Sequence, residues 1–192
     1  MARGINEPII GIDEVGRGCW AGPLLVVAAQ AVKKLPKGLK DSKLLSKKQR
    51  EALFEKIVNS CDLGEGWVEP TEIDSLGLTQ ATKLGVERAL LSINASVDQP
   101  IIIDGNYNFC SAQYTDVSCV IDGDAKIGII SAASIYAKVK RDQYMSEQAK
   151  VHPIYGFENH VGYGTAEHKS KLREHGICPL HRLSFKPVQE MI

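Results

Sequence analysis

The pattern of apolar and polar positions divides the first third of the chain into short strands. Apolar residues at 9–12 and again at 23–32, the second run rich in β-branched residues, predict two strands joined by a glycine-rich turn. Pro23 suits the first position of a strand. Residues 61–68 predict a third strand.

Helical spacing of apolar residues marks the segments between and after these strands. Ser46 and Gln49 match a capping box, and an apolar stripe follows at Leu53, Phe54, Ile57 and Val58. We therefore expect a helix from Ser46 to about Ser60. Residues 70–93 also have helical spacing, with a break expected near Gly77.

The second half adds two short buried strands at 99–104 and 116–121, then a long helix at 127–149. A last helix is expected from Thr165, as its N-cap, to His175, with Gly176 ending it. Strands followed by strands alternating with helices predict an α/β fold with a mixed sheet. We expect a core at 1–150 and a C-terminal appendage at 151–192 that forms one catalytic unit with it.

Composition places the chain among ordinary globular proteins. Its 192 residues suffice for one domain with a buried core, and 44% are hydrophobic while 24% are charged. Five scattered cysteines without a Cys-x-x-Cys pair indicate free thiols in a reducing compartment. Because neither a targeting segment nor an apolar run of membrane-spanning length is present, we expect a cytoplasmic protein.

Charge is distributed unevenly along a chain whose formal net charge is zero. Between Lys33 and Arg50 lie eight basic residues and one acid, Asp41. A solvated loop and helix face explains such a run, and so does a phosphate-binding patch; charge alone favours the first interpretation.

Acidic residues follow the predicted buried strands. Asp13 and Glu14 come after the first strand, Asp104 ends the fourth, and Asp124 lies just beyond the fifth. A carboxylate at the end of a buried strand costs desolvation unless a cation or a donor compensates it. Neighbouring strand ends in one sheet lie close together, so these acids predict an oxygen-only site for Mg²⁺ or Mn²⁺. The alternative is that the Asp-Gly pairs only make turns.

Other motifs do not meet the context that they require. The segment 16–21 fits G-x-G-x-x-A, but a β-branched run follows where a dinucleotide site needs a helix. The five histidines lie in the last 41 residues without zinc-site spacing, so surface or hydrogen-bonding roles are favoured. The chain contains neither a G-x-S-x-G nucleophile motif nor a P-loop.

Six sequence blocks together resemble the bacterial ribonuclease HII family over residues 9–188. They are GIDEVGRG (11–18), DSK (41–43), IIDGN (102–106), GDAKIGIISAASIYAKVKRD (123–142), YGFENHVGYGT (155–165) and HRLSF (181–185). The resemblance implies a ribonuclease H-like fold, with a mixed five-stranded central sheet flanked by helices and a small helical C-terminal region. One departure is Cys19-Trp20, where many relatives have Pro-Leu after Gly-Arg-Gly.

The resemblance also implies an activity: an endonuclease that hydrolyses the RNA strand of RNA/DNA hybrids and incises DNA duplexes 5′ of a single embedded ribonucleotide, for ribonucleotide removal from DNA. The family's catalytic and metal-binding acids correspond to Asp13, Glu14, Asp104 and Asp124. Two Mn²⁺ or Mg²⁺ ions about 3.5 to 4 Å apart would flank the scissile phosphate, and cleavage would leave 5′-phosphate and 3′-hydroxyl ends.

Substrate recognition is implied for a second set of residues. The Gly16-Arg17-Gly18 turn would contact the ribonucleotide around its 2′-hydroxyl, and Tyr163 would pack on the sugar beyond the RNA-to-DNA junction. Lys43, Lys138 and Arg182 would hold phosphates. We expect a monomer whose protein partners the sequence does not identify. The alternatives are another nuclease of the same fold, or a non-catalytic domain that binds nucleic acid through the segment 33–50.

Overall fold

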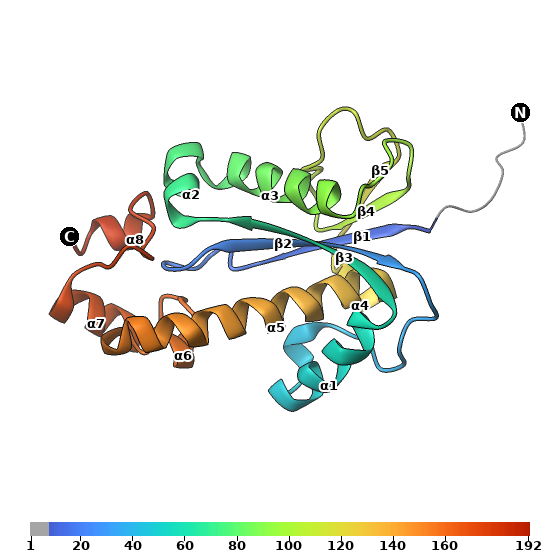
Figure 1. Ribbon diagram of the computed structural model, residues 1–192. Helices are drawn as coiled ribbons and strands as arrows, with labels where there is room; N and C mark the ends of the chain where they lie inside the picture. The colour runs from blue at the N-terminus through green and yellow to red at the C-terminus, as the bar shows by residue number, and fades with distance from the viewer. Residues whose placement is uncertain (1–7) are drawn as a thin grey trace, which may run out of the picture.

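The computed structural model describes residues 8–192 and shows a sheet between two layers of helices (Figure 1). The strands are β1 (Ile10–Val15), β2 (Leu24–Ala31), β3 (Cys61–Val68), β4 (Ile101–Asp104) and β5 (Val117–Val120). Their order is β3-β2-β1-β4-β5. β1–β2 and β2–β3 are antiparallel, whereas β1–β4 and β4–β5 are parallel. The mixed five-stranded sheet predicted from the sequence is confirmed.

The longer helices also agree with the sequence pattern. They are α1 (Lys47–Val58), α2 (Pro70–Leu76), α3 (Leu78–Ser92), α5 (Gly128–Val151) and α7 (Ala166–His175). Ser46 caps α1 in a capping box, Gly77 separates α2 from α3, and Thr165 caps α7. The short elements η1 (Ser42–Leu44), α4 (Gly123–Lys126), η2 (Pro153–Tyr155), α6 (Phe157–His160) and α8 (Lys186–Gln189) were not predicted, because one turn gives no periodic signal.

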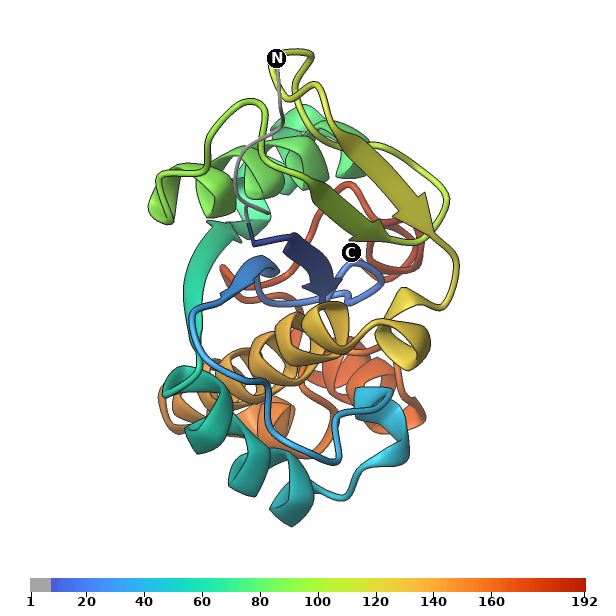
Figure 2. The ribbon, with the colours of Figure 1, turned by 90° about the vertical axis from the view of Figure 1, so that its right-hand side faces the viewer.

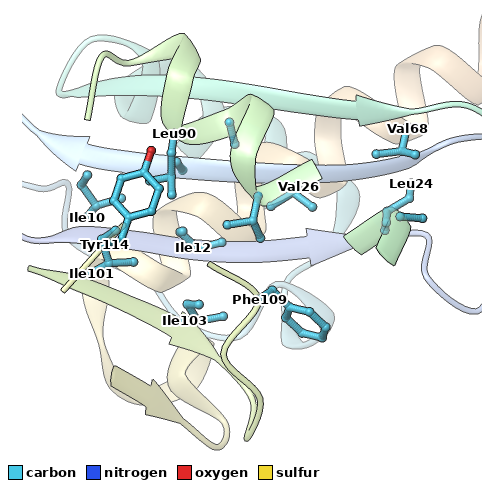
Figure 3. Close-up of a cluster of buried hydrophobic side chains, with 14 of the residues drawn as sticks. Ile10, Ile12, Leu24, Val26, Val68, Leu90, Ile101, Ile103, Phe109 and Tyr114 are labelled. Atoms are coloured by element: carbon cyan, nitrogen blue, oxygen red, sulfur yellow. The ribbon is translucent and has the colours of Figure 1, made fainter. Parts of the chain in front are cut away.

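Each face of the sheet has its own apolar layer. On one face α3 covers a cluster that includes Ile10, Ile12, Val26, Leu90, Ile103 and Phe109 (Figure 3). On the other face Ile57 of α1 and Ile130 and Ala133 of α5 pack in one cluster with Leu25 and Val27 of β2. Figure 2 shows α5 passing below the sheet and α3 above it. Two buried faces explain why β2 is an almost continuous apolar run instead of alternating with polar residues.

Helix α5 approaches β1 very closely. A Cβ on Gly11 would overlap the backbone of Ile129 and Ile130, so only glycine allows this contact. β1 itself is longer than predicted, because its ladder to β2 continues through Asp13 and Glu14 to Val15. The two acids are therefore part of the strand and do not lie in the turn after it.

The C-terminal helices lie against the turn between β1 and β2, at the left of Figure 1. The backbone N–H groups of Trp20 and Ala21 both donate to Gly162 O, at 2.8 and 3.2 Å, and Ala21 forms an isolated β-bridge with His181. The division at residue 150, within the last turn of α5, stays a prediction. Among residues 8–192, every helix is too short or too polar to cross a membrane.

Candidate active site

Three of the predicted acids line one pocket of about 400 Å³ at the end of the sheet. Ile12 of β1 pairs with Ile103 of β4 in parallel register, so Asp13 and Asp104 follow at the same level. Glu14 is the third acid, and the remaining lining residues are Val15, Gly16, Arg17, Gly18, Ser42, Lys43, Ser134, Lys138 and Tyr163. The ends of β1 and β4 therefore converge as expected from the sequence, whereas Asp124 beyond β5 does not line this pocket.

Asp13 and Glu14 leave β1 on opposite faces, because successive side chains of a strand alternate. The Asp13 side chain is 8% exposed, and its Oδ1 accepts a 2.7 Å hydrogen bond from Glu14 N. Glu14 forms an ion pair of 3.8 Å with Arg17. Both acids reach the same pocket because it lies at the end of the sheet, where the two faces meet.

Asp104 and Asp124 are held by groups near the start of α4. Oδ1 of Asp104 accepts a 2.6 Å hydrogen bond from Gly123 N. Asp124 is 5% exposed, and its Oδ2 lies 3.8 Å from Lys43 Nζ. Asp124 itself is outside the pocket lining, and Lys43 connects it to the pocket.

Burial and mutual repulsion raise the proton affinity of Asp13, Glu14 and Asp124. Desolvation, followed by the charges of Glu14 and Asp104, holds the pKa of Asp13 well above its usual range. Desolvation also raises the pKa of Glu14 and of Asp124, and the Asp104 charge adds to both shifts. The pocket thus concentrates negative charge that a bound cation would stabilise.

The donor set fits a hard divalent cation, since it supplies only carboxylate oxygens. Within residues 8–192, no three His, Cys, Asp or Glu side chains are arranged to hold one ion. Three of the carboxylates have separate partners instead. Glu14 pairs with Arg17, Asp104 accepts a hydrogen bond from a backbone N–H, and Asp124 pairs with Lys43. Coordination would require these side chains to turn from those partners toward a common point.

Two fully buried arginines hold the turn that follows β1. Arg141 of α5 donates from Nε to Pro23 O, from Nη1 to Val161 O and from Nη2 to Ala21 O, at 2.8–3.1 Å. Arg182 donates from Nε and Nη2 to Gly22 O and from Nη1 to Arg17 O, at 2.8–3.0 Å. Arg182 thus connects Arg17 of the Gly-Arg-Gly turn to the C-terminal segment. Arg141 connects residues 21–23, further along the same β1–β2 connection, to α5. Both guanidiniums therefore fix the path of the chain that forms the pocket wall.

Tyr163 reaches the pocket from the loop between α6 and α7 and is 40% exposed. Its backbone is fixed from both sides, because Tyr163 N donates to His160 O and Tyr163 O accepts from Nδ1 of His168. Lys138 enters from α5 and forms a 2.8 Å ion pair with Asp142. The predicted recognition residues on these two elements therefore face the pocket that contains the acids.

Three histidines form a buried network behind Tyr163. Because His168 Nδ1 donates to Tyr163 O, its Nε2 accepts the proton of His181 Nε2 across 3.0 Å, and His181 Nδ1 accepts from Cys178 N. The ring of His160 stacks on that of His168, with centroids 4.4 Å apart. Burial lowers the pKa of His168 and of His181 to about 4, so these two imidazoles are neutral near pH 7. The hydrogen-bonding role favoured from the sequence is confirmed for these three.

The chain is similar to known proteins over nearly its whole length. The family model for Ribonuclease HII matches residues 10–188. The Ribonuclease HII of Endomicrobium trichonymphae is 46% identical over 96% of this chain and 88% of its own length. The chain belongs to the ribonuclease HII family. Membership in this family makes the protein a ribonuclease H.

Solved structures show that the fold is ribonuclease H-like, as expected. A ribonuclease HII from Archaeoglobus fulgidus, solved in complex with PCNA, superposes with a TM-score of 0.80 at 26% identity, over 93% of this chain and 95% of that one. Ribonuclease H2 from Pyrococcus horikoshii OT3 gives a TM-score of 0.77 at 27% identity, over 95% and 96% of the two chains.

One prediction within the ribonuclease HII site needs correction. Arg182 was expected to hold a phosphate, but its side chain is fully buried and donates only to backbone carbonyl oxygens. The β1–β2 connection needs that guanidinium to satisfy the buried carbonyl oxygen of Gly22 and to hold Arg17 O. Arg182 therefore shapes the recognition turn and is not available to the substrate.

Sequence reasoning missed three residues of the site. Ser42 and Ser134 line the pocket and bond to each other through their hydroxyls, 3.0 Å apart, and Arg141 anchors the turn. The only signal for Ser134 was its position among small residues of the long helix. Arg141 gave none, because an arginine on a helix is normally expected at the surface.

Proposed function

We propose that this ribonuclease HII family member hydrolyses the RNA strand of RNA/DNA hybrids and incises DNA duplexes 5′ of a single embedded ribonucleotide. The observation that carries the proposal is one pocket that contains both Asp13, Glu14 and Asp104 and the Gly16-Arg17-Gly18 turn. Carboxylates supply a site for hydrolysis, and the turn supplies backbone groups that can approach a ribose closely.

Asp13, Glu14, Asp104 and Asp124 would hold two Mn²⁺ or Mg²⁺ ions when substrate is bound. Bound divalent ions supply Lewis-acid activation of water and stabilise negative charge on the scissile phosphate and its leaving 3′ oxygen. Asp13 is the best candidate for a shared ligand, since it is the most desolvated of the acids at the centre of the pocket. Its proton must leave before it can bind a cation, which couples activity to pH.

The other pocket residues would orient the substrate. The backbone of Gly16 and Gly18 and the Arg17 side chain would contact the ribonucleotide around its 2′-hydroxyl, while Tyr163 packs on the following sugar. Lys43 and Lys138 would neutralise phosphate oxygens. Both lysines pair with carboxylates now, so a phosphate has to compete with Asp124 and Asp142 for them. We further propose that the protein acts as a monomer in the cytoplasm, where its five free cysteines would stay reduced.

The test is cleavage of a labelled DNA duplex with one ribonucleotide, with Mg²⁺ or Mn²⁺ and then with a chelator. We expect a metal-dependent nick on the 5′ side of the ribonucleotide, with a 3′-hydroxyl that a polymerase can extend. A plain DNA duplex and an RNA/DNA hybrid are run in parallel. Cleavage of the hybrid alone would indicate a hybrid-only ribonuclease of the same fold, and binding without cleavage would indicate a non-catalytic domain.

The variant Tyr163→Ala separates recognition from chemistry. Because Tyr163 would pack on the sugar after an RNA-to-DNA junction, we expect its removal to reduce cleavage at a single ribonucleotide more than cleavage of a long hybrid. An equal loss on both substrates would contradict the junction role. Tyr163→Phe is the matched control, since it keeps the ring and should retain most of the preference.

A further inference from the structure

Seven lysines between residues 33 and 48 are exposed to solvent beside the pocket. This lysine strap consists of Lys33, Lys34, Lys37, Lys40, Lys43, Lys47 and Lys48. The segment 33–50 has an excess of seven positive charges, although the whole chain is neutral. The remainder of the chain therefore has a net charge of −7, and the local excess of positive charge lies in this segment.

The backbone under the strap is anchored, which fixes where the lysines point. Leu35 and Leu39 alternate with lysines along the segment, pack into the apolar layer beneath α5, and lie against Gly128 at its first turn. At the start of the segment, the N–H groups of Val32 and Lys33 both donate to Ser60 O, at 3.0 and 3.1 Å. The leucines face the core and the lysines face solvent.

The other end of the strap is anchored at the pocket. Ser42 Oγ lies 3.0 Å from Ser134 Oγ on α5, and Arg50 Nη1 donates to Ser42 O and Leu45 O. Between these anchors Lys43 lines the pocket and lies near Asp124. In Figure 2 the pale-blue segment runs past the start of α5 and ends beside α4. The strap is thus continuous with the site of hydrolysis.

Most of the positive charge on the lysine strap is not paired with a carboxylate. Among the residues that the structure describes, Lys43 is the only strap lysine with a carboxylate within 4 Å. The Arg50 guanidinium is bound to backbone oxygens and does not face solvent with the others. Like charges fixed on an anchored segment repel one another, and a ligand with regularly spaced negative charges removes that repulsion.

We propose that the lysine strap binds the backbone phosphates of the duplex that flanks the cleavage site. This inference rests on the proposed nucleic-acid substrate. It explains how a chain without net charge holds a polyanion: the pocket recognises one nucleotide, and the strap supplies affinity that does not depend on sequence.

The test uses the variant K34Q/K37Q/K40Q, which leaves Lys43 and every pocket residue in place. Its binding to a plain DNA duplex is measured across a series of salt concentrations. The slope of log Kd against log salt concentration should decrease by about 0.9 for each lysine that contacts a phosphate, and so by up to about 2.7. The control K56Q/K150Q/K186Q removes the same charge from exposed lysines outside the strap, and its slope should match the wild type.

An unchanged slope in the strap variant, or an equal decrease in the control, would overturn the proposal. A second readout uses the duplex with one ribonucleotide, on which KM should rise while kcat stays at the wild-type value; a fall in kcat with unchanged KM would also overturn it. Failure of the proposed function is distinguishable, because it would abolish nicking by the wild type while the binding of plain duplex could still be measured.

Discussion

The guanidinium of Arg141 occupies the space that a Cβ on Gly16 would fill. Gly16 also has φ of +86°, a region that favours glycine. Arg141 in turn donates to the carbonyl oxygens of Pro23, Ala21 and Val161. Gly16, the first glycine of the Gly-Arg-Gly turn, is therefore required by its contact with Arg141, independently of any role in substrate binding.

The pair Gly16→Ala and Gly18→Ala tests this relationship. Gly16→Ala must displace Arg141 and adopt a strained φ, so we expect a loss of about 2–4 kcal/mol in the free energy of unfolding and a large loss of nicking. A Cβ on Gly18 meets nothing within 4 Å, so Gly18→Ala should change stability by less than about 0.5 kcal/mol. Denaturant unfolding measures both. Equal stability losses would show that the two glycines have the same role.

Arg182→Lys tests whether that guanidinium shapes the turn or meets a phosphate. A lysine cannot reproduce its three hydrogen bonds, so we expect a loss of about 2–4 kcal/mol in unfolding free energy. The salt dependence of duplex binding should stay as in the wild type. Lys43→Gln is the comparison: it removes an exposed pocket cation and should lower the slope of log Kd against log salt by about 0.9. A lower slope in Arg182→Lys would indicate that Arg182 does contact a phosphate, as expected from the sequence.

Asp13→Asn should remove activity and stabilise the fold. The raised pKa of Asp13 means that the folded state favours the protonated form, so its contribution to stability is complete at low pH and is lost as the pH rises through that pKa. The amide removes this loss while its oxygen can still accept from Glu14 N. We expect a gain in the free energy of unfolding at pH 7 that disappears in acid. Unfolding curves at both pH values check this, and a less stable variant at pH 7 would refute it.

The buried histidines should make the protein less stable in acid. Its pKa values of about 4 for His168 and His181 lie below the value near 6.5 expected in the unfolded chain. The stabilisation is therefore complete above pH 6.5 and decreases as the pH falls toward 4, by about 1.4 kcal/mol per pH unit for each histidine. His181→Asn should reduce that slope by the contribution of one histidine, about 1.4 kcal/mol per pH unit. Identical slopes in the variant and the wild type would show that His181 stays accessible to protons when folded.

The sequence patterns predicted elements that are set by local chemistry. The capping box at Ser46, the break at Gly77 and the Thr165 cap all involve residues within one turn of each other, so their identity suffices. The acids at the ends of β1 and β4 were found because a charge after a buried strand is costly unless it has a function. Each of these signals can be read without knowledge of the tertiary contacts.

Long-range contacts were beyond such reasoning. Arg141 and Arg182 bond to a turn more than a hundred residues away in the chain, and exposure is the default expectation for arginine. β1 was predicted to end at residue 12, because two acids usually mark a strand's end, yet pairing with Val26 and Val27 carries the strand through them. The sequence also gave no sign that Glu14, Asp104 and Asp124 have separate local partners.

The arginine contacts have a consequence for how freely the recognition turn can vary. Arg141 and Arg182 hold it through carbonyl oxygens, which every amino acid provides. The side chains of Cys19 and Trp20 do not take part in those bonds, so replacing them leaves the arginine contacts in place. A proline at position 19 would remove only the backbone N–H that Cys19 donates to Gly16 O at 3.3 Å. The arginines thus separate the path of this loop from the identity of its side chains, a separation that protein engineers could use to vary the loop.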